Sequence, residues 1–396
     1  MKHNRLFSSL VLLLCLSHLA HAQRVLRVIK ANTDKASIID EPYPKLDWYL
    51  DPAVRPDIYY MNVPGKPGTV TVKTDLDSFT VDTKPGRSYD LVVLLNGKDS
   101  CFIRIAALRD TLRQVRGIGK NPARDTIPFT LHGSRIYLKG FLNNKPVNIQ
   151  FDLGAGASAV NRQSAEKLGI QFDGNTMVTN TQGTNKTLTS SNNTLRIADI
   201  KWGPVKLVQV GNMQPQEDLI IGNSLFMDKI VEIDYDRSLL IIHKGLPNYS
   251  RYYSVMPVWF EQDRPRFQAV TEVGGKRYSF WFLFDTGRDA TMALGSDFTA
   301  YEGLWDKLDS LTTVNGRKIV RLNAEIAGVK FPDIVTNAQD PNMPGSSRPT
   351  LIGNQVLSHF NVILDNRQGF IYLKLNSRSD EPYSDYKGYQ ESMKAK

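Results

Sequence analysis

Two aspartates in this chain of 396 residues end apolar stretches that are similar to each other. Asp152 follows Val-Asn-Ile-Gln-Phe and Asp285 follows Phe-Trp-Phe-Leu-Phe, and both continue as Asp-x-Gly with a pair of small residues shortly after. Two carboxylates held about 3 Å apart cannot both ionise, so they share one proton. The ionised member can then take a proton from water while the protonated member polarises a carbonyl group. Asp152 and Asp285 are therefore candidates for a catalytic pair.

A second repeated block follows each aspartate at nearly the same distance. The second block reads Leu-Ile-Ile-Gly-Asn in the first copy and Leu-Ile-Gly-Asn in the second. Its glycine, Gly222, lies 70 residues after Asp152, and the equivalent Gly353 lies 68 residues after Asp285. Both blocks continue into strand-like segments that align without a gap. A lone Asp-Thr-Gly commonly marks a turn, but two matched pairs at matched separation indicate an internal duplication.

The segments between these blocks also repeat. Residues 178–197 and 311–326 have the pattern of hairpins, with turns at Gly183 and Gly316. Residues 161–168 have the composition of a helix, and Gly169 is a stop signal for it.

The repeated blocks resemble the pepsin and retropepsin superfamily of aspartic proteases, most of all bacterial retropepsin-like proteins with both lobes in one chain. The resemblance covers residues 127–375 and implies one lobe at 129–250 and another at 251–375. In such proteins each lobe supplies an aspartate on a loop, and a second strand ending in an apolar-apolar-Gly block crosses that loop. The implied site consists of the catalytic Asp152 and Asp285, the loop residues Gly154, Ala155, Thr286, Gly287 and Arg288, and the crossing-strand residues Gly222 and Gly353.

The resemblance also implies the function. We expect an aspartic endopeptidase that needs no cofactor and holds a polypeptide substrate in a cleft between the lobes. Glycine after each aspartate lets the backbone bend tightly enough to bring both acids to the lobe interface. Gly183 and Gly316 are candidate flap residues, although only one hairpin need close over the substrate. Because one chain holds both halves, dimerisation is not required to build the site.

Two residues depart from the family pattern. Family members have Thr or Ser after the catalytic Asp, and this hydroxyl bonds to the opposite lobe; Thr286 can form the bond, whereas Leu153 cannot. Arg288 stands where a small or hydroxyl residue is expected, and a guanidinium pointing at Asp285 would favour its carboxylate form and oppose proton sharing. The alternative function is therefore a catalytically weak or inactive protease-like protein that binds peptides.

The regions outside the resemblance complete a mainly β protein. Residues 1–22 have the charge, apolar run and small-residue ending of a signal peptide cleaved after Ala22, which predicts a periplasmic or secreted protein. Residues 23–112 alternate in strand-like fashion and predict an amino-terminal β-sandwich-like domain, including a hairpin at Asn96-Gly97 and a buried Cys101. Residues 113–128 have the composition of a linker, and 376–396 form a polar tail expected to be loosely ordered.

Composition and motifs argue against other functions. Basic residues are scattered among acidic ones, without the stripe or motif that nucleic-acid binding would require. The chain has neither paired histidines such as His-Glu-x-x-His for a metal nor Gly-x-Ser-x-Gly for a serine hydrolase. No segment after the first 22 residues is apolar enough to span a bilayer.

Overall fold

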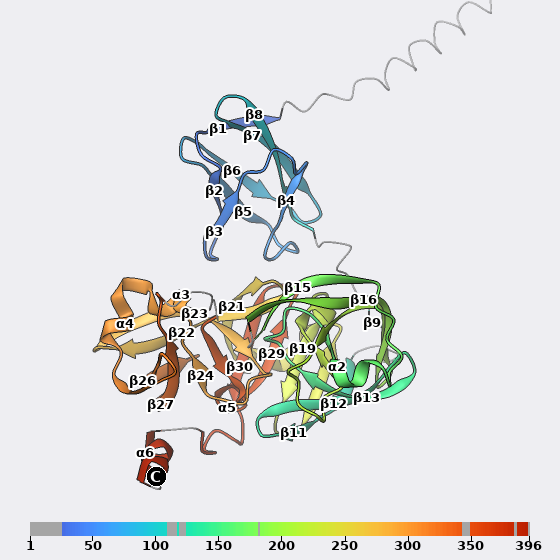
Figure 1. The fold of residues 1–396 in the computed structure, drawn as a ribbon, viewed down its shortest axis with the longest axis vertical. Helices are drawn as coiled ribbons and strands as arrows, with labels where there is room; N and C mark the ends of the chain where they lie inside the picture. Colours follow the sequence, from blue (N-terminus) through green and yellow to red (C-terminus); the bar gives the residue numbers. More distant parts are fainter. Residues whose placement is uncertain are drawn as a thin grey trace, which may run out of the picture. The chain divides into compact units, whose positions relative to one another are not determined.

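A computed structural model describes residues 26–108, 117–118, 124–180, 183–342, 349–383 and 386–394. The predicted signal peptide at 1–22 lies outside the described residues, and only 117–118 and 124–128 of the predicted linker are described. The chain forms two compact units, one made of Met1–Met61 with Pro67–Leu108 and the other of Asn62–Lys66 with Arg109–Lys396 (Figure 1). In the described ranges, no helix combines the length and the apolar character that crossing a membrane would take.

The first unit is a sandwich of two four-stranded sheets, in the orders β1-β7-β8-β4 and β3-β2-β5-β6. Its strands are β1 (Arg27–Ala31), β2 (Lys35–Asp40), β3 (Leu46–Tyr49), β4 (Asp57–Tyr60), β5 (Gly68–Lys73), β6 (Ser78–Thr83), β7 (Ser88–Leu95) and β8 (Asp99–Ala106). Alternate residues of both sheets, among them Ile38, Val70 and Leu91, form one buried core that includes Cys101. The hairpin predicted at Asn96-Gly97 joins β7 to β8, and both residues have positive φ (52° and 68°), as a tight two-residue turn requires.

The second unit contains two lobes with equivalent elements. The first lobe holds β9 (Gly117–Ile118), β10 (Arg124–Pro128), β11 (Thr130–His132), β12 (Arg135–Leu142), β13 (Lys145–Phe151), β14 (Ala159–Asn161), α2 (Arg162–Ala165), β15 (Gly174–Asn180), β16 (Gly183–Ile197), β17 (Ile200–Val210), β18 (Leu219–Ile221), η2 (Asn223–Phe226), β19 (Ile230–Asp234), β20 (Leu239–His243) and η3 (Asn248–Tyr252). The second holds β21 (Ser254–Glu261), β22 (Arg264–Val273), β23 (Lys276–Asp285), β24 (Met292–Ala293), α3 (Ser296–Thr299), η4 (Tyr301–Gly303), α4 (Leu304–Lys307), β25 (Ser310–Val314), β26 (Arg317–Ile326), β27 (Val329–Gln339), β28 (Leu351–Gly353), α5 (Asn354–Leu357), β29 (Phe360–Asp365) and β30 (Phe370–Leu375), followed by α6 (Tyr386–Lys394).

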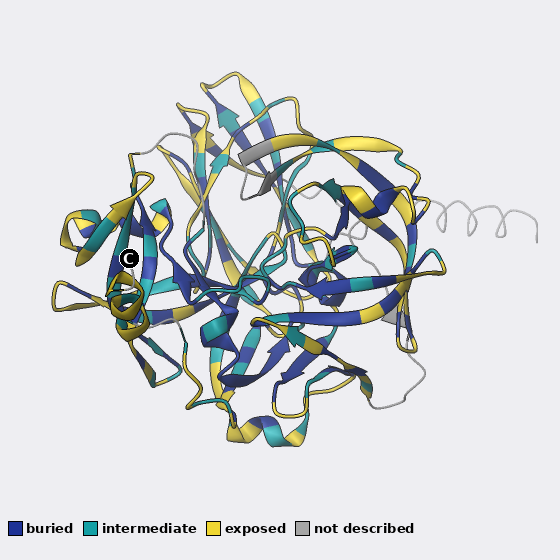
Figure 2. Ribbon diagram, turned by 60° about the horizontal axis from the view of Figure 1, so that its bottom comes forward, coloured by how far each residue is buried: buried dark blue, intermediate teal, exposed yellow. Residues whose placement is uncertain are grey.

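The two lobes are joined by a shared sheet, which we call the interlobe sheet, in the order β10-β20-β19-β29-β30-β21. Its central pair is β19 against β29, antiparallel, with Val231 opposite Leu364 and Ile233 opposite Val362. One hydrophobic cluster runs through both lobes. In Figure 2 the buried stretches follow the strands that carry this core, and exposed residues gather on the outer hairpins and on α6.

The local elements agree with most of the sequence interpretation. The hairpins predicted at 178–197 and 311–326 are β15–β16 and β25–β26. The helix predicted at 161–168 is shorter than expected: α2 begins after Asn161, whose side chain accepts from the Gln163 amide at 3.1 Å, and the chain then turns to Gly169 at φ 66°. The expectation of loose order for the tail missed α6, where the Arg321 guanidinium lies 4.4 Å from the centre of the Tyr386 ring.

Candidate active site

The two aspartates occupy equivalent loops, each crossed by a strand from its own lobe. In the first lobe β18 lies beside β13 with Phe151 opposite Ile221, and in the second β28 lies beside β23 with Phe284 opposite Ile352. Both crossing strands end in glycine because the loops pass too close for a side chain: a Cβ on Gly222 would collide with the Ala155 carbonyl. A Cβ on Gly353 would collide with a carbonyl of the second loop in the same way.

The carboxyl groups of Asp152 and Asp285 meet at the lobe interface and hydrogen bond to each other. Each carboxyl group also accepts a hydrogen bond from its own loop. Gly154 N donates to Asp152 Oδ1 at 2.8 Å, and Gly287 N donates to Asp285 Oδ1 at 3.1 Å. Each loop glycine lies against the aspartate of the other lobe. A Cβ on Gly154 would be 2.6 Å from Oδ1 of Asp285, and one on Gly287 would overlap the Asp152 carboxylate. The pair is thus confined on both sides, yet both residues remain partly exposed.

The environment of this pair favours a retained proton. Burial, and then the neighbouring charge of Asp285, raise the pKa of Asp152 well above its ordinary value. Burial also raises the pKa of Asp285, but the Arg288 charge and hydrogen bonds to the carboxylate pull it back part of the way. Two neighbouring acids whose pKa values are both raised can hold one proton between them.

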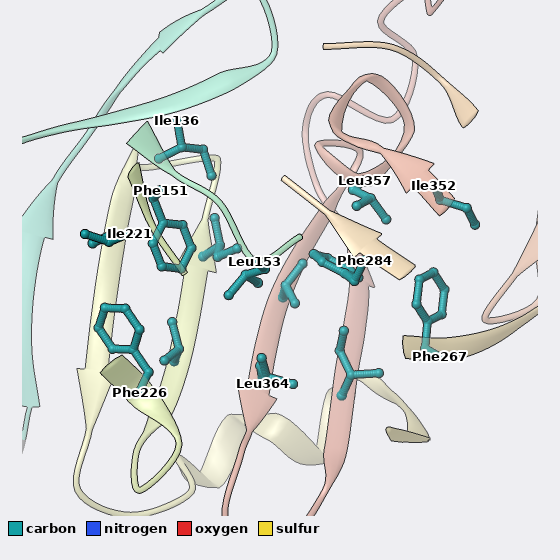
Figure 3. Close-up of a cluster of buried hydrophobic side chains, with 14 of the residues drawn as sticks. Ile136, Phe151, Leu153, Ile221, Phe226, Phe267, Phe284, Ile352, Leu357 and Leu364 are labelled. Atoms are coloured by element: carbon teal, nitrogen blue, oxygen red, sulfur yellow. The ribbon is translucent and has the colours of Figure 1, made fainter. Parts of the chain in front are cut away.

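The hydroxyl of Thr286 makes the cross-lobe bonds expected of the residue after the aspartate. Its Oγ1 accepts from Leu153 N at 2.9 Å and donates to the carbonyl of Phe151 at 3.1 Å. Leu153 cannot return a side-chain bond. Its side chain is fully buried instead, between Phe151 of the first lobe and Phe284 of the second (Figure 3). The Thr286 hydroxyl of the second loop therefore holds the first loop by hydrogen bonds, whereas Leu153 of the first loop contributes apolar packing.

Arg288 follows the second Asp-Thr-Gly and is partly buried. Among the described residues its guanidinium has no ion pair, and its Nε atom is buried without a hydrogen-bond partner. Burial lowers the pKa of Arg288, and the charges of Arg317 and Arg135 lower it further against the opposing effect of Asp285. The guanidinium thus acts on Asp285 through space, without the salt bridge that would lock that carboxylate in its ionised form.

Three first-lobe residues that the sequence interpretation did not single out hold the second loop. Gln150 Nε2 and Arg135 Nε each donate to the carbonyl of Gly287 at 3.0 Å. Ser134 donates its amide and its hydroxyl to Asp289, at 3.0 and 2.8 Å. Gln150 carried a usable signal, since it is a buried polar residue within an apolar strand directly before Phe151-Asp152.

The asparagines that follow the crossing-strand glycines also bridge the lobes. Asn223 Nδ2 donates to the Asp263 carbonyl at 2.9 Å and to Asn366 Oδ1 at 2.7 Å, both in the second lobe. Asn354, from the second lobe, donates in turn to the Ser134 carbonyl in the first. Both asparagines are fully buried. Their presence in both repeated blocks was the signal that could have identified them.

The two glycines predicted as flap residues lie at the starts of equivalent hairpins. Gly183 is the first residue of β16, opposite Asn180, and the two residues between them lie outside the described ranges. Gly316, at φ 73°, forms with Asn315, at φ 50°, the tight turn between β25 and β26. A pocket of about 350 Å³ lies at this second hairpin and is lined by Val314, Asn315, Arg317, Ile319 and Asn337.

Comparison with known proteins identifies a protein family for part of the first lobe. No curated protein sequence matches the chain. Among solved structures, the crystal structure of aspartic proteinase from Irpex lacteus aligns with a TM-score of 0.44 and 11% identity, over 65% of this chain and 99% of that chain. Residues 138–225, which include Asp152 and the first crossing strand, match the family described as Aspartyl protease. The resemblance of this chain to the aspartic proteases, predicted from its repeated blocks, is thereby confirmed.

Proposed function

We propose that this protein is an exported aspartic endopeptidase that hydrolyses peptide bonds with water activated by Asp152 and Asp285. The observation that carries the proposal is the hydrogen-bonded carboxyl pair, each member braced by the glycine of the opposite loop. Export is supported by the signal-peptide pattern of residues 1–22. One chain supplies both acids, so the proposed site needs no second subunit.

The asymmetry of the pair suggests how the roles divide. The positive charge of Arg288 favours the ionised form of Asp285, and burial beside that negative charge favours a protonated Asp152. In this assignment Asp285 takes a proton from the attacking water, and Asp152 donates its hydrogen bond to the scissile carbonyl as charge develops on its oxygen. A proton then passes to the leaving nitrogen and the C–N bond breaks.

The test is cleavage of a denatured protein mixture by the chain from Gln23 onward, between about pH 3 and pH 8, with products read by mass spectrometry. We expect internal cleavages that Asp152→Asn and Asp285→Asn each abolish while the proteins stay folded. Asp228→Asn is a matched control, because the Asp228 side chain is 54% exposed and forms an ion pair with the adjacent Lys229. Absence of cleavage by the folded wild-type protein at every pH, with and without reducing agent, would overturn the proposal.

A second candidate function is peptide binding without turnover. Two observations favour it: the lack of a hydroxyl at Leu153, and the guanidinium of Arg288 within electrostatic reach of Asp285. In that case peptides would bind without being cut, and Asp285→Asn would leave their affinity nearly unchanged. Calorimetry with peptides from the same mixture separates the two functions.

A further inference from the structure

The pocket at the second hairpin is formed by one face of a three-stranded sheet. Val314 on β25 pairs with Arg317 on β26, and Ile319 on β26 pairs with Asn337 on β27. Because paired residues project to the same side of a sheet, these four side chains share one face. That face bounds the space of about 350 Å³, which is within the usual range for small ligand sites.

Arg317 is the charged residue of this face. Its side chain is partly buried, and its guanidinium has no hydrogen bond or ion pair with any residue that the structure describes. The adjacent Lys318 projects to the opposite face and is fully engaged there: its Nζ donates to the Trp305 carbonyl at 2.6 Å and lies 4.2 Å from the centre of the Trp305 ring. Of these two neighbouring cations, only Arg317 is available to a ligand in the pocket.

A second cation, Arg288, lies within electrostatic reach of both Arg317 and the carboxyl pair. Arg288 is close enough to Arg317 for the charge of one to affect the other, and close enough to Asp285 to affect the pKa of that acid. Its Nε is buried and has no partner within the described ranges. Two partly buried guanidinium groups within electrostatic reach repel each other, and an anion bound to both would relieve the repulsion and satisfy the unmet donor of Arg288.

We propose that Arg317 and Arg288 form a cationic subsite that recognises a carboxylate of the polypeptide substrate, on the Asp285 side of the scissile bond. The inference rests on the proposed endopeptidase function and names its substrate class: peptides with an acidic group near the cut. The carboxylate comes from a Glu or Asp side chain or from a free carboxyl terminus. Asn337 in the pocket wall supplies an amide donor to the same group.

The experiment compares matched peptides that differ by one group. A cleaved sequence is remade with Glu or Gln at each position on either side of the cut, and with a free or amidated carboxyl terminus. We expect kcat/KM to favour Glu over Gln about tenfold at one position, or the free acid over the amide if the terminus is the source, because a charge-assisted bond replaces a neutral one. Arg317→Gln should bring the ratio of kcat/KM between the Glu and Gln peptides to about one. Arg317→Glu should cut a peptide with Lys at that position better than the Glu peptide. Arg277→Gln, which removes an exposed charge of the same lobe that pairs with Glu325, should preserve the ratio.

Binding is measured by fluorescence anisotropy with the Asp285→Asn protein, on the same peptides or, if nothing is cleaved, on the Glu and Gln variants of a peptide from the mixture that the protein binds. The subsite is thus tested even if cleavage fails. Wild-type protein that cuts nothing would overturn the endopeptidase, while a Glu preference in binding that Arg317→Gln removes would still support the subsite. Glu and Gln peptides bound and cut alike, or a Glu preference that survives Arg317→Gln, would overturn the subsite and leave the endopeptidase in place.

Discussion

The two aspartate loops share a backbone arrangement and differ in two side chains. In both loops the residue two places after the aspartate is a glycine that donates to the carboxylate and lies against the opposite acid. The second position is Leu153 in one loop and Thr286 in the other, and the fourth is Ala155 in one and Arg288 in the other. The positions that set the geometry are therefore alike in both loops, and those that set bonding and charge are not.

The difference teaches how one hydroxyl can serve a site that normally has two. Thr286 holds the first loop by accepting from one backbone group and donating to another. Leu153 offers the second loop no hydroxyl, and the carbonyl of Gly287 is held instead by Gln150 and Arg135. Side chains from neighbouring strands thus replace the missing half, and Leu153 fills the interface with apolar surface.

The shared geometry predicts the largest effect. A methyl group on Gly287 or Gly154 would displace the opposite aspartate, and a misplacement of about 1 Å costs on the order of 100-fold in rate. We therefore expect Gly287→Ala and Gly154→Ala each to lower kcat/KM at least about 100-fold. Gly156→Ala is the matched control, because its Cβ would have no neighbour closer than 3.6 Å. Activity near wild type in Gly287→Ala would mean that the two acids are not confined as described.

The unequal second positions predict an intermediate effect on stability. Thr286→Val removes two buried cross-lobe hydrogen bonds and should lower the free energy of unfolding by about 1–3 kcal/mol. Leu153→Thr, which restores the family pattern in sequence, should also destabilise, by about 2 kcal/mol, since it removes buried apolar surface and adds a buried hydroxyl. Urea denaturation measures both. A stabilising Leu153→Thr would show instead that the first loop lacks a bond it could have made.

The unequal charges predict the smallest effect, a difference in how pH acts on stability. Because folding raises the pKa of Asp152, its protonation stabilises the fold at acidic pH, and this contribution is lost as the pH rises through the raised pKa. Asp152→Asn should therefore raise the Tm at pH 7 and change it little at pH 3. Asp285→Asn should raise it less, since Arg288 already compensates that carboxylate. In an Arg288→Gln background we expect the two increases to converge, and equal increases in the wild-type background would contradict the asymmetry.

Much of this architecture was predictable because duplication repeats its signals. Three features each occur twice: an apolar strand before Asp152 or Asp285, a later block ending in Gly222 or Gly353, and a hairpin between them. Each copy therefore supported the interpretation of the other. The bonding of Thr286 to the other lobe also followed from its hydroxyl and its place in the triplet.

The sequence could not predict hydrogen bonds between residues that are distant along the chain. Gln150 and Arg135 bond to Gly287, 137 and 152 residues away. A polar residue within an apolar strand marked Gln150 as unusual, but no local pattern encodes its partner. The direction of the Arg288 side chain was equally open, because the same residue could have faced solvent. The helix α6 was missed because it buries none of its residues, so the tail has no apolar stripe of the kind by which a packed helix is recognised.

The interlobe sheet determines what would happen if the lobes were produced separately. Cutting the chain between β20 and β21 would leave β19 of one fragment and β29 of the other with a row of unpaired backbone amides and carbonyls along one side. Exposed strand edges of this kind recruit other chains, so each fragment alone would tend to self-associate. When the two fragments are mixed, pairing of β19 with β29 would compete with this self-association. The two lobes are therefore a natural starting point for a split-protein reporter, in which assembly of the two fragments is detected by the reconstitution of the Asp152–Asp285 pair.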